Sequence, residues 1–237
     1  MPGKHVHFLD VPATPSSTYS SSTLASSPGP ATPPQLFRSP ASAKASLHPP
    51  SRYAPGGISL NPIIARQLGT TTPLVWDMSE PAQSARPQLP PAPSRLTDAL
   101  VREPATHPPL PSIAVICDYL PWTIIVVPTP GSLWAAPYVT VGDVLHTLYR
   151  TLRLAATDHE LGVLDPALRD RVQRAYVARY RLVGNPRERE LEMAKSVKRV
   201  DYLCDRTAFL GLTAVPSGNP AKGLPPGTVW ALHVAKP

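Results

Sequence analysis

The stretch IAVICDYLPWTIIVV, residues 113–127, carries the clearest strand signal in the chain. Two runs rich in β-branched residues, 113–117 and 122–127, lie on either side of Asp118-Tyr119-Leu120-Pro121. Short β-branched runs around a few turn-forming residues are typical of paired strands. The sequence therefore predicts two strands joined by a tight turn.

A first helix is predicted shortly after the hairpin. Thr140-Val141-Gly142-Asp143 has the hydroxyl-x-x-acid spacing of a capping box. Apolar residues then recur at helical spacing up to Ala155, so the pattern predicts a helix over about 141–155.

A second helix is predicted to begin where Asp165 precedes Pro166, because an acidic N-cap followed by proline is a helix start signal. Its apolar face extends to about Leu182, and Gly184-Asn185-Pro186 ends it. The charged stretch 187–197 is predicted to form a short exposed helix.

The C-terminal part contains three apolar segments, 199–203, 208–212 and 228–234, which we predict as strands. A Gly/Pro loop over 216–227 joins the last two. Because strands flank a helical middle, the sequence predicts an α+β fold. It should contain a small antiparallel sheet with two to three helices, preceded by a disordered N-terminal arm.

The N-terminal half has a different composition, since 22 of the 33 prolines lie before residue 113. Residues 1–57 are rich in Ser, Thr and Pro with few large apolar residues, so we predict a disordered arm there. Residues 58–237 are predicted to form a single domain. Within it, 58–68 should form one or two helical turns, and 81–111 should run extended over the surface.

The short segment 73–78 is predicted to be strand-like and to anchor the arm to the domain. Trp76 is the natural docking residue, because its large side chain buries much apolar area.

The amino-acid composition only weakly restricts the kind of binding partner and the cellular compartment. The net charge of +7 and pI near 9.6 suit an anionic partner, but only 16% of residues are charged. No run of 18 apolar residues and no secretory signal are present, so we expect a cytoplasmic or nuclear protein without membrane association. Cys117 and Cys204 lie in apolar runs, where a small buried thiol is the ordinary interpretation.

Seven short stretches of the sequence form a recognisable set: Lys4–Phe8, Trp76-Asp77, Pro104–Thr106, Pro121-Trp122, Val139–Leu145, Arg199–Leu203 and Phe209–Leu212. Together they resemble an uncharacterised fungal family with a domain of unknown function. The resemblance implies a domain within residues 58–234 and a fungal origin, and it supplies no activity.

The sequence contains none of the common motifs for dinucleotide binding, phosphate loops, serine hydrolases or zinc proteases. We therefore expect a non-enzymatic protein without a cofactor. Lys222-Gly223 lies in a Gly/Pro-rich stretch with the wrong spacing for a phosphate loop, and a mobile hairpin loop is the expected structure.

Polar residues at four places in the sequence are candidate sites. The pairs His5/His7 and Asp143/His146 have the spacing of metal ligands, but nothing nearby completes a site, and Asp143 is expected on the polar side of its helix. The stretch 158–160 is expected to be a solvated turn. Asp201 lies in an apolar segment, so we expect it to be paired with Arg199 or a backbone amide in a structural role.

The second predicted helix, 166–182, carries the densest positive cluster. Its arginines could bind phosphate groups, which makes nucleic-acid association the alternative function. A solvated helix face is the more common interpretation, because aromatic residues are not interleaved with them. The cluster consists of Arg169, Arg171, Arg174, Arg179 and Arg181, of which Arg171, Arg174 and Arg181 are the candidate anion contacts.

The arm contains Lys4-x-Val6-x-Phe8, which resembles the short motif by which regulators dock as a β-strand onto type-1 protein phosphatase. Alternatively, the match is a chance one, or the segment pairs with this protein's own domain.

The arm also carries four Ser/Thr-Pro pairs that proline-directed kinases could phosphorylate. Four phosphates would add about −6 to −8 charge, although such pairs also arise readily in a tract rich in these residues. Our leading hypothesis is a regulatory protein whose domain binds a protein partner and whose arm is a docking and phosphorylation segment. The candidate phosphorylation sites are Thr14, Ser27, Thr32 and Ser39.

Overall fold

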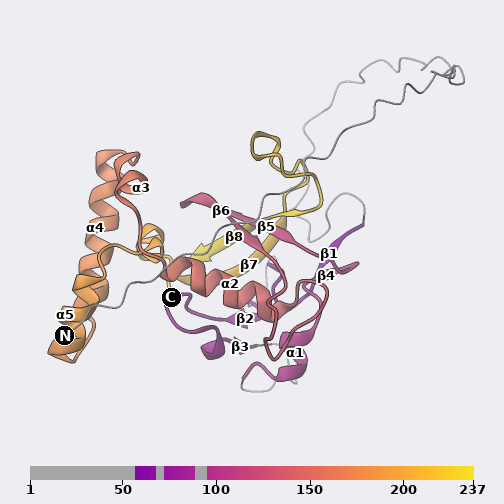
Figure 1. The fold of residues 1–237 in the computed structure, drawn as a ribbon. Coiled ribbons are helices and arrows are strands. Elements are labelled where there is room, and N and C mark those ends of the chain that lie inside the picture. The colour runs from indigo at the N-terminus through magenta and orange to yellow at the C-terminus, as the bar shows by residue number, and fades with distance from the viewer. Residues whose placement is uncertain (1–56, 68–71, 89–94) are drawn as a thin grey trace, which may run out of the picture. The chain divides into compact units, whose positions relative to one another are not determined.

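The computed structural model describes residues 57–67, 72–88 and 95–237. The predicted arm therefore lies outside the described residues, except for Gly57. The described residues form a mixed α+β structure, which confirms the predicted fold class (Figure 1).

The central sheet has four strands in the order β6-β5-β8-β7. The predicted hairpin is present as β5 (Ile113–Cys117) and β6 (Leu120–Val126), an antiparallel pair joined at Asp118-Tyr119. The turn is two residues shorter than the sequence suggested, because Leu120 already pairs with Cys117.

The other two strands are β7 (Ala208–Ala214) and β8 (Val229–Ala235), which pair in an antiparallel manner. The loop between them contains the 3-10 turn η3 (Pro220–Lys222). In contrast to the predicted antiparallel order, β8 lies parallel to β5. This placement puts the C-terminal strand at the centre of the sheet, where Trp230 is completely buried.

Helix α2 (Val141–Arg153) lies against this sheet and contacts β6 (Figure 1). The predicted capping box is present, because Thr140 and Asp143 exchange side-chain and backbone hydrogen bonds. Leu145, Leu148 and Leu152 follow at helical spacing and are at most 1% exposed. The apolar stripe of α2 therefore forms one wall of the core.

A helical extension follows α2. It consists of α3 (Asp158–Gly162), α4 (Pro166–Arg181) and α5 (Pro186–Ala194), with α4 and α5 packed side by side (Figure 1). Helices α4 and α5 confirm the predicted helices, whereas α3 replaces an expected turn. Val172 is the only residue of α4 that is buried. Apolar burial therefore contributes little to holding α4 against the rest of the domain.

The prediction of a strand over 199–203 is wrong, because Arg199–Leu203 forms the 3-10 helix η2. The Asp201 carboxylate accepts a hydrogen bond from the Lys198 backbone amide at 2.8 Å. This contact closes a turn at the start of the segment, so its apolar residues pack on the core as a short helix.

The N-terminal part of the domain adds two small sheets, each an antiparallel pair. Strands β1 (Ser59–Leu60) and β4 (Thr106–His107) form one, and β2 (Leu74–Val75) and β3 (Arg86–Pro87) form the other. The short helices η1 (Ala82–Ser84) and α1 (Asp98–Arg102) complete this part.

The described part of the Pro-rich segment 81–111 contributes to the core as well as running over the surface. Ala82, Ala85, Ala105 and Thr106 are all buried. The expectation of an extended surface segment therefore misses these small side chains, which are packed in the core.

The outer edge of β7 is covered by two segments from this N-terminal part. Asp77 bridges to Ala208, and Ala65 bridges to Leu212. The segment that was expected to be helical, 58–68, begins as a strand and makes one turn after Asn61.

Two residues fix this edge. A Cβ at Gly211, where φ is +105°, would lie 2.6 Å from the Arg66 amide nitrogen. Glycine therefore permits the close approach. Trp76 is 3% exposed and packs against Phe209, so the predicted anchor lies in the core.

We predict that Leu148→Ala lowers the free energy of unfolding by about 2–5 kcal/mol, because it opens a cavity under α2. Leu133→Ala, at a site that is 73% exposed, should change it by less than about 0.5 kcal/mol. Urea denaturation measures both. Equal losses in the two variants would contradict the burial of α2.

Candidate functional site

An open groove of about 690 Å³ runs between α4 and the turn after η2. Its lining is mainly apolar along α4, where Ala175, Ala178 and Leu182 face Val200 of η2. Residues 77, 79, 204–207 and Pro237 form the opposite wall. We call this feature the α4 groove.

Two arginines border the groove from α4. Arg171 and Arg174 lie three positions apart, so they project from one side of the helix. Within the described part of the chain, neither forms an ion pair with a carboxylate. Both are exposed, and their guanidinium groups can therefore bind an incoming anion.

The other arginines of α4 have different roles. Arg169 donates hydrogen bonds to the carbonyl oxygens of Leu161 and Gly162 and so ties α4 to α3. Arg179 is bound within the domain. Arg181, the third candidate anion contact, does not line the groove.

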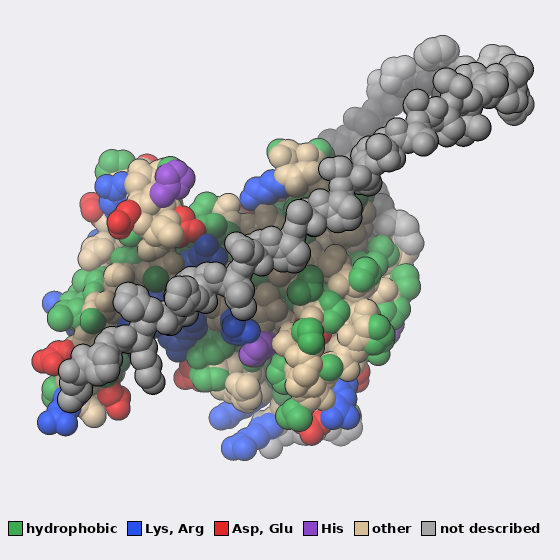
Figure 2. All heavy atoms as spheres, viewed as in Figure 1, with side chains coloured by type: hydrophobic (Ala, Val, Ile, Leu, Met, Phe, Trp, Pro, Cys, Tyr) green, Lys and Arg blue, Asp and Glu red, His purple; other side chains and the backbone are tan. Residues whose placement is uncertain are grey.

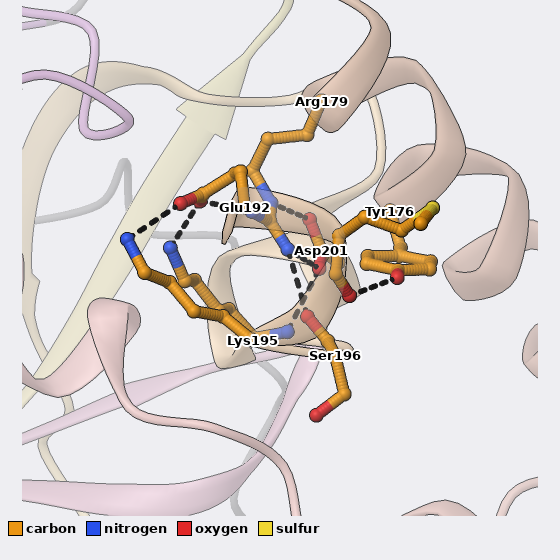
Figure 3. Close-up of polar contacts among 8 residues, drawn as sticks. Tyr176, Arg179, Glu192, Lys195, Ser196 and Asp201 are labelled. Carbon is orange, nitrogen blue, oxygen red and sulfur yellow. Dashed lines mark hydrogen bonds and ion pairs between the residues drawn. The ribbon is translucent and has the colours of Figure 1, made fainter. Parts of the chain in front are cut away.

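Arg179 is the centre of a polar network that joins α4, α5 and η2 (Figure 3). Its Nε and Nη2 donate to the two oxygens of Asp201 at 2.8 and 2.9 Å. Its Nη2 also donates to the Ser196 carbonyl oxygen, and its Nη1 binds Glu192. Asp201 is 3% exposed and paired, in agreement with the predicted structural role. The predicted bond from a backbone amide is present, from Lys198, whereas the side-chain partner is Arg179 and not Arg199.

Glu192 receives hydrogen bonds from Lys195 and Lys198 as well as from Arg179. Burial of this carboxyl opposes its ionisation, but the bonds from Lys198 and Lys195 outweigh burial and lower its pKa to about 2. Glu192 is therefore a carboxylate at neutral pH. It holds the start of η2 against α5.

The opposite wall of the groove contributes one more cation. Arg206 lies 3.7 Å from Asp205 and stacks over the Tyr119 ring. Asp205 is also bound by Lys236 at 2.6 Å. This wall therefore carries paired charges, and the free positive charge lies on the α4 side, facing Asp77 across the groove.

Cys204 lies in the groove and is half-buried, so the expectation of a buried thiol is wrong for this residue. It ends η2 with φ +57°, which turns its side chain toward the groove wall instead of the core. Burial raises the pKa of its thiol, and the nearby charges of Arg171 and Arg174 oppose that effect. Cys117, in contrast, is buried as expected.

The structure separates the remaining polar candidates from the groove. Asp143 is fully buried, not on a polar face, and accepts hydrogen bonds from Thr129, Trp134 and Thr140. His146 packs beside the Trp134 ring. One oxygen of Asp143 thus caps the start of α2 at Thr140, and the other ties Thr129 and Trp134 of the preceding loop to the helix.

The stretch 158–160 forms most of α3 instead of a solvated turn. Glu160 caps the helix at Thr157 and also pairs with Arg199 at 2.8 Å. Trp122 donates to the same carboxylate. In the loop before β8, Lys222 donates to Thr123 Oγ1 at 3.0 Å, which ties the loop to β6.

Among residues 57–67, 72–88 and 95–237, no group of three or more possible ligands could hold a metal ion. In the same residues, no helix is long and apolar enough to cross a membrane. Figure 2 shows Lys and Arg side chains gathering between the α3–α5 extension and the rest of the domain. The predicted arm sites lie outside the described residues: Lys4, Val6, Phe8, Thr14, Ser27, Thr32 and Ser39, with His5 and His7.

Sequence reasoning identified Arg171 and Arg174 but missed the wall that faces them. Cys204 and Arg206 come from a turn that the strand prediction for 199–203 had hidden. Asp77 comes from a segment over 90 residues earlier in the chain. The one local signal for the turn was Asp201, whose carboxylate accepts a hydrogen bond from the backbone amide of Lys198 three residues earlier.

Residues 74–221 match the model of a family described as a family of unknown function (DUF6699). No curated protein and no solved structure matches the chain.

We predict that Glu192→Gln lowers the free energy of unfolding at neutral pH by about 1.5–3 kcal/mol, the usual contribution of hydrogen bonds to charged groups. The folded-state pKa of about 2 lies below the ordinary value of 4.5. The contribution is thus fully present above the ordinary pKa and is lost as the pH falls toward the folded pKa. Urea denaturation should show the gap between the two proteins shrinking from pH 5 to pH 2.

The matched control is Glu188→Gln, an exposed glutamate on the same helix. It should change the free energy of unfolding by less than about 0.5 kcal/mol at all these pH values. A gap for Glu192→Gln that stays constant from pH 5 to pH 2 would contradict the network.

Proposed function

The chain belongs to the DUF6699 family of unknown function, and we propose that it is a non-enzymatic regulatory protein whose α4 groove binds an acidic or phosphorylated segment of a protein partner. One observation carries the proposal. Arg171 and Arg174 are exposed, free of carboxylate partners among the described residues, and adjacent to an apolar lining.

The chemistry of the groove suits a peptide with both an anion and apolar side chains. Two guanidinium groups can each donate two hydrogen bonds to one phosphate group. The apolar side chains along α4 offer a surface for neighbouring residues of the peptide. Clusters of arginines are a recurring means of recognising phosphorylated peptides.

The arm adds a second binding segment to this proposal. Lys4, Val6 and Phe8 dock onto a type-1 protein phosphatase by adding a strand to it, and phosphorylation of the four Ser/Thr-Pro sites regulates the protein. A fungal origin and a cytoplasmic or nuclear location complete this view of the protein. The resemblance of the arm motif and the composition of the chain support these points.

Nucleic-acid association through helix 166–182 is the second candidate function. The free guanidinium groups of Arg171 and Arg174 favour it. Against it, Arg169 and Arg179 are engaged within the domain, so the positive surface of α4 is interrupted. Its affinity would fall steeply with salt, and Arg181 would contribute to it as much as Arg171.

We predict that the full-length protein binds a fluorescent synthetic peptide with one phosphothreonine-proline pair between leucines. Arg171→Ala/Arg174→Ala should weaken binding about ten-fold or more, because one lost hydrogen bond to a charged group costs about 1.5–3 kcal/mol. Fluorescence anisotropy measures the affinity.

The matched control is Arg181→Ala/Arg187→Ala, which removes the same charge outside the groove. This variant should retain the affinity of the wild-type protein. Equal weakening in both variants would indicate general electrostatic attraction and favour the nucleic-acid alternative.

We also predict that full-length protein recovers type-1 phosphatase in a pull-down with the purified enzyme, and that Val6→Ala/Phe8→Ala abolishes the recovery. The two side chains would otherwise enter pockets beside the added strand. Equal recovery by both proteins would refute the docking motif without affecting the groove.

A further inference from the structure

We propose that the partner segment bound in the α4 groove carries charges of both signs: beside its acidic or phosphorylated residue stands a Lys or Arg, and Asp77 binds that cation. This inference rests on the proposed function of the groove and names the class of segment that the groove selects. It follows from the charges that line the groove, from the contacts that hold them, and from the effect of an unpaired carboxylate on an incoming anion.

The charges that line the groove differ in whether they are already paired. Asp205 is bound by two neighbouring cations. In the described part of the chain, Asp77 pairs with no Lys or Arg, just as Arg171 and Arg174 pair with no carboxylate. The groove therefore offers a ligand two unpaired positive charges on one wall and an unpaired negative charge on the other.

The Asp77 carboxylate is held in place by its surroundings. Its neighbours in the chain, Trp76 and Met78, are 3% and 0% exposed, so the backbone is anchored in the core here. The Ser79 backbone amide donates to Asp77 Oδ1 at 2.8 Å, which orients the side chain and leaves Oδ2 for a further contact. A carboxylate fixed in this way can bind a cation without first being ordered.

The opposite wall is fixed as well. Arg179 holds α4 against Asp201 (Figure 3), and Arg171 and Arg174 extend from the same helix. The unpaired charges of the two walls are thus presented from anchored parts of the domain. A segment interacts favourably with all of them only if it carries charges of both signs, and such complementarity is a source of specificity.

Asp77 also disfavours ligands that carry only negative charge. A carboxylate near an incoming phosphate group repels it, and like charges placed together are a common means of rejecting wrong partners. A nucleic acid carries phosphate groups along its whole length and offers no cation to Asp77. The carboxylate therefore favours a peptide of mixed charge over a nucleic acid.

The two walls also restrict where the cation stands in the segment. A residue that precedes proline is held in an extended conformation. Successive side chains of an extended chain point to opposite sides. With a phosphothreonine directed at Arg171 and Arg174, the residue immediately before it is directed at the wall of Asp77. A lysine two residues before the phosphothreonine points back toward the arginines.

The test compares three fluorescent peptides on the full-length protein by fluorescence anisotropy. The first is the phosphothreonine peptide described above, without lysine. The second has lysine immediately before the phosphothreonine, and the third has it two residues before. The second should bind about ten-fold more tightly than the first. This change corresponds to about 1.4 kcal/mol, within the reach of one charge-assisted hydrogen bond.

The third peptide is the control for overall charge, because it has the same composition as the second. The protein has a net charge of +7. A lysine that met only this overall charge would be repelled. The third peptide should therefore bind no more tightly than the first.

Asp77→Asn removes the charge and keeps the structural contact, because asparagine Oδ1 can still accept the hydrogen bond from the Ser79 amide. The variant should bind the lysine-free peptide about three-fold more tightly, since a repelling charge is gone. It should bind the first and second peptides equally. The matched control is Glu80→Gln, an exposed acid that does not line the groove, which should behave as the wild-type protein.

The outcomes separate this inference from the proposed function. If none of the peptides binds the wild-type protein, the proposed function of the groove is wrong and the inference falls with it. If the lysine-free peptide binds and the adjacent lysine adds no affinity, the inference alone is overturned. An increase that persists in Asp77→Asn, or that both lysine positions give equally, also overturns it, because the lysine then binds elsewhere.

Discussion

The position of α4 depends on the ion pair between Arg179 and Asp201. Only Val172 of this 16-residue helix is buried, and one buried valine contributes about 1.5–3 kcal/mol. Asp201 is 3% exposed and lies on η2, which packs on the core. Leu168 and Tyr176 are partly buried against the core as well. Removing one partner of a buried pair costs about 3–5 kcal/mol, so this pair contributes at least as much as the burial of Val172.

The arginines of α4 have two different roles. Arg179 and Arg169 use their donors within the domain, and they hold α4 at its two ends. Arg171 and Arg174 lie between them on the groove side, without carboxylate partners in the described residues. A helix fixed at both ends that carries free guanidinium groups suits the anion binding that we propose for the α4 groove.

Local signals in the sequence predicted much of the fold. The capping box at Thr140 and Asp143 identified α2, and the β-branched runs after Ile113 identified the hairpin. The segment Arg199–Leu203 has the apolar composition of a strand, and only the Asp201 cap reveals its helical turn. The parallel pairing of β5 with β8 has no local signal, because it joins segments over 100 residues apart.

The groove was predictable on one side only. Arg171 and Arg174 stand out as a pattern on a single helix, but the opposing wall is assembled from three distant segments. The sequence also does not show which arginines lack a carboxylate partner. Arg179 and Arg181 look equivalent in the sequence, because tertiary contacts decide which of them is paired.

The most direct test is an NMR titration of the arginine Nε–Hε signals of the full-length protein with the phosphothreonine peptide. The account predicts that the signals of Arg171 and Arg174 shift on binding, while that of Arg179 stays fixed because Asp201 already holds it. A shift of the Arg179 signal together with unchanged signals of Arg171 and Arg174 would contradict the account.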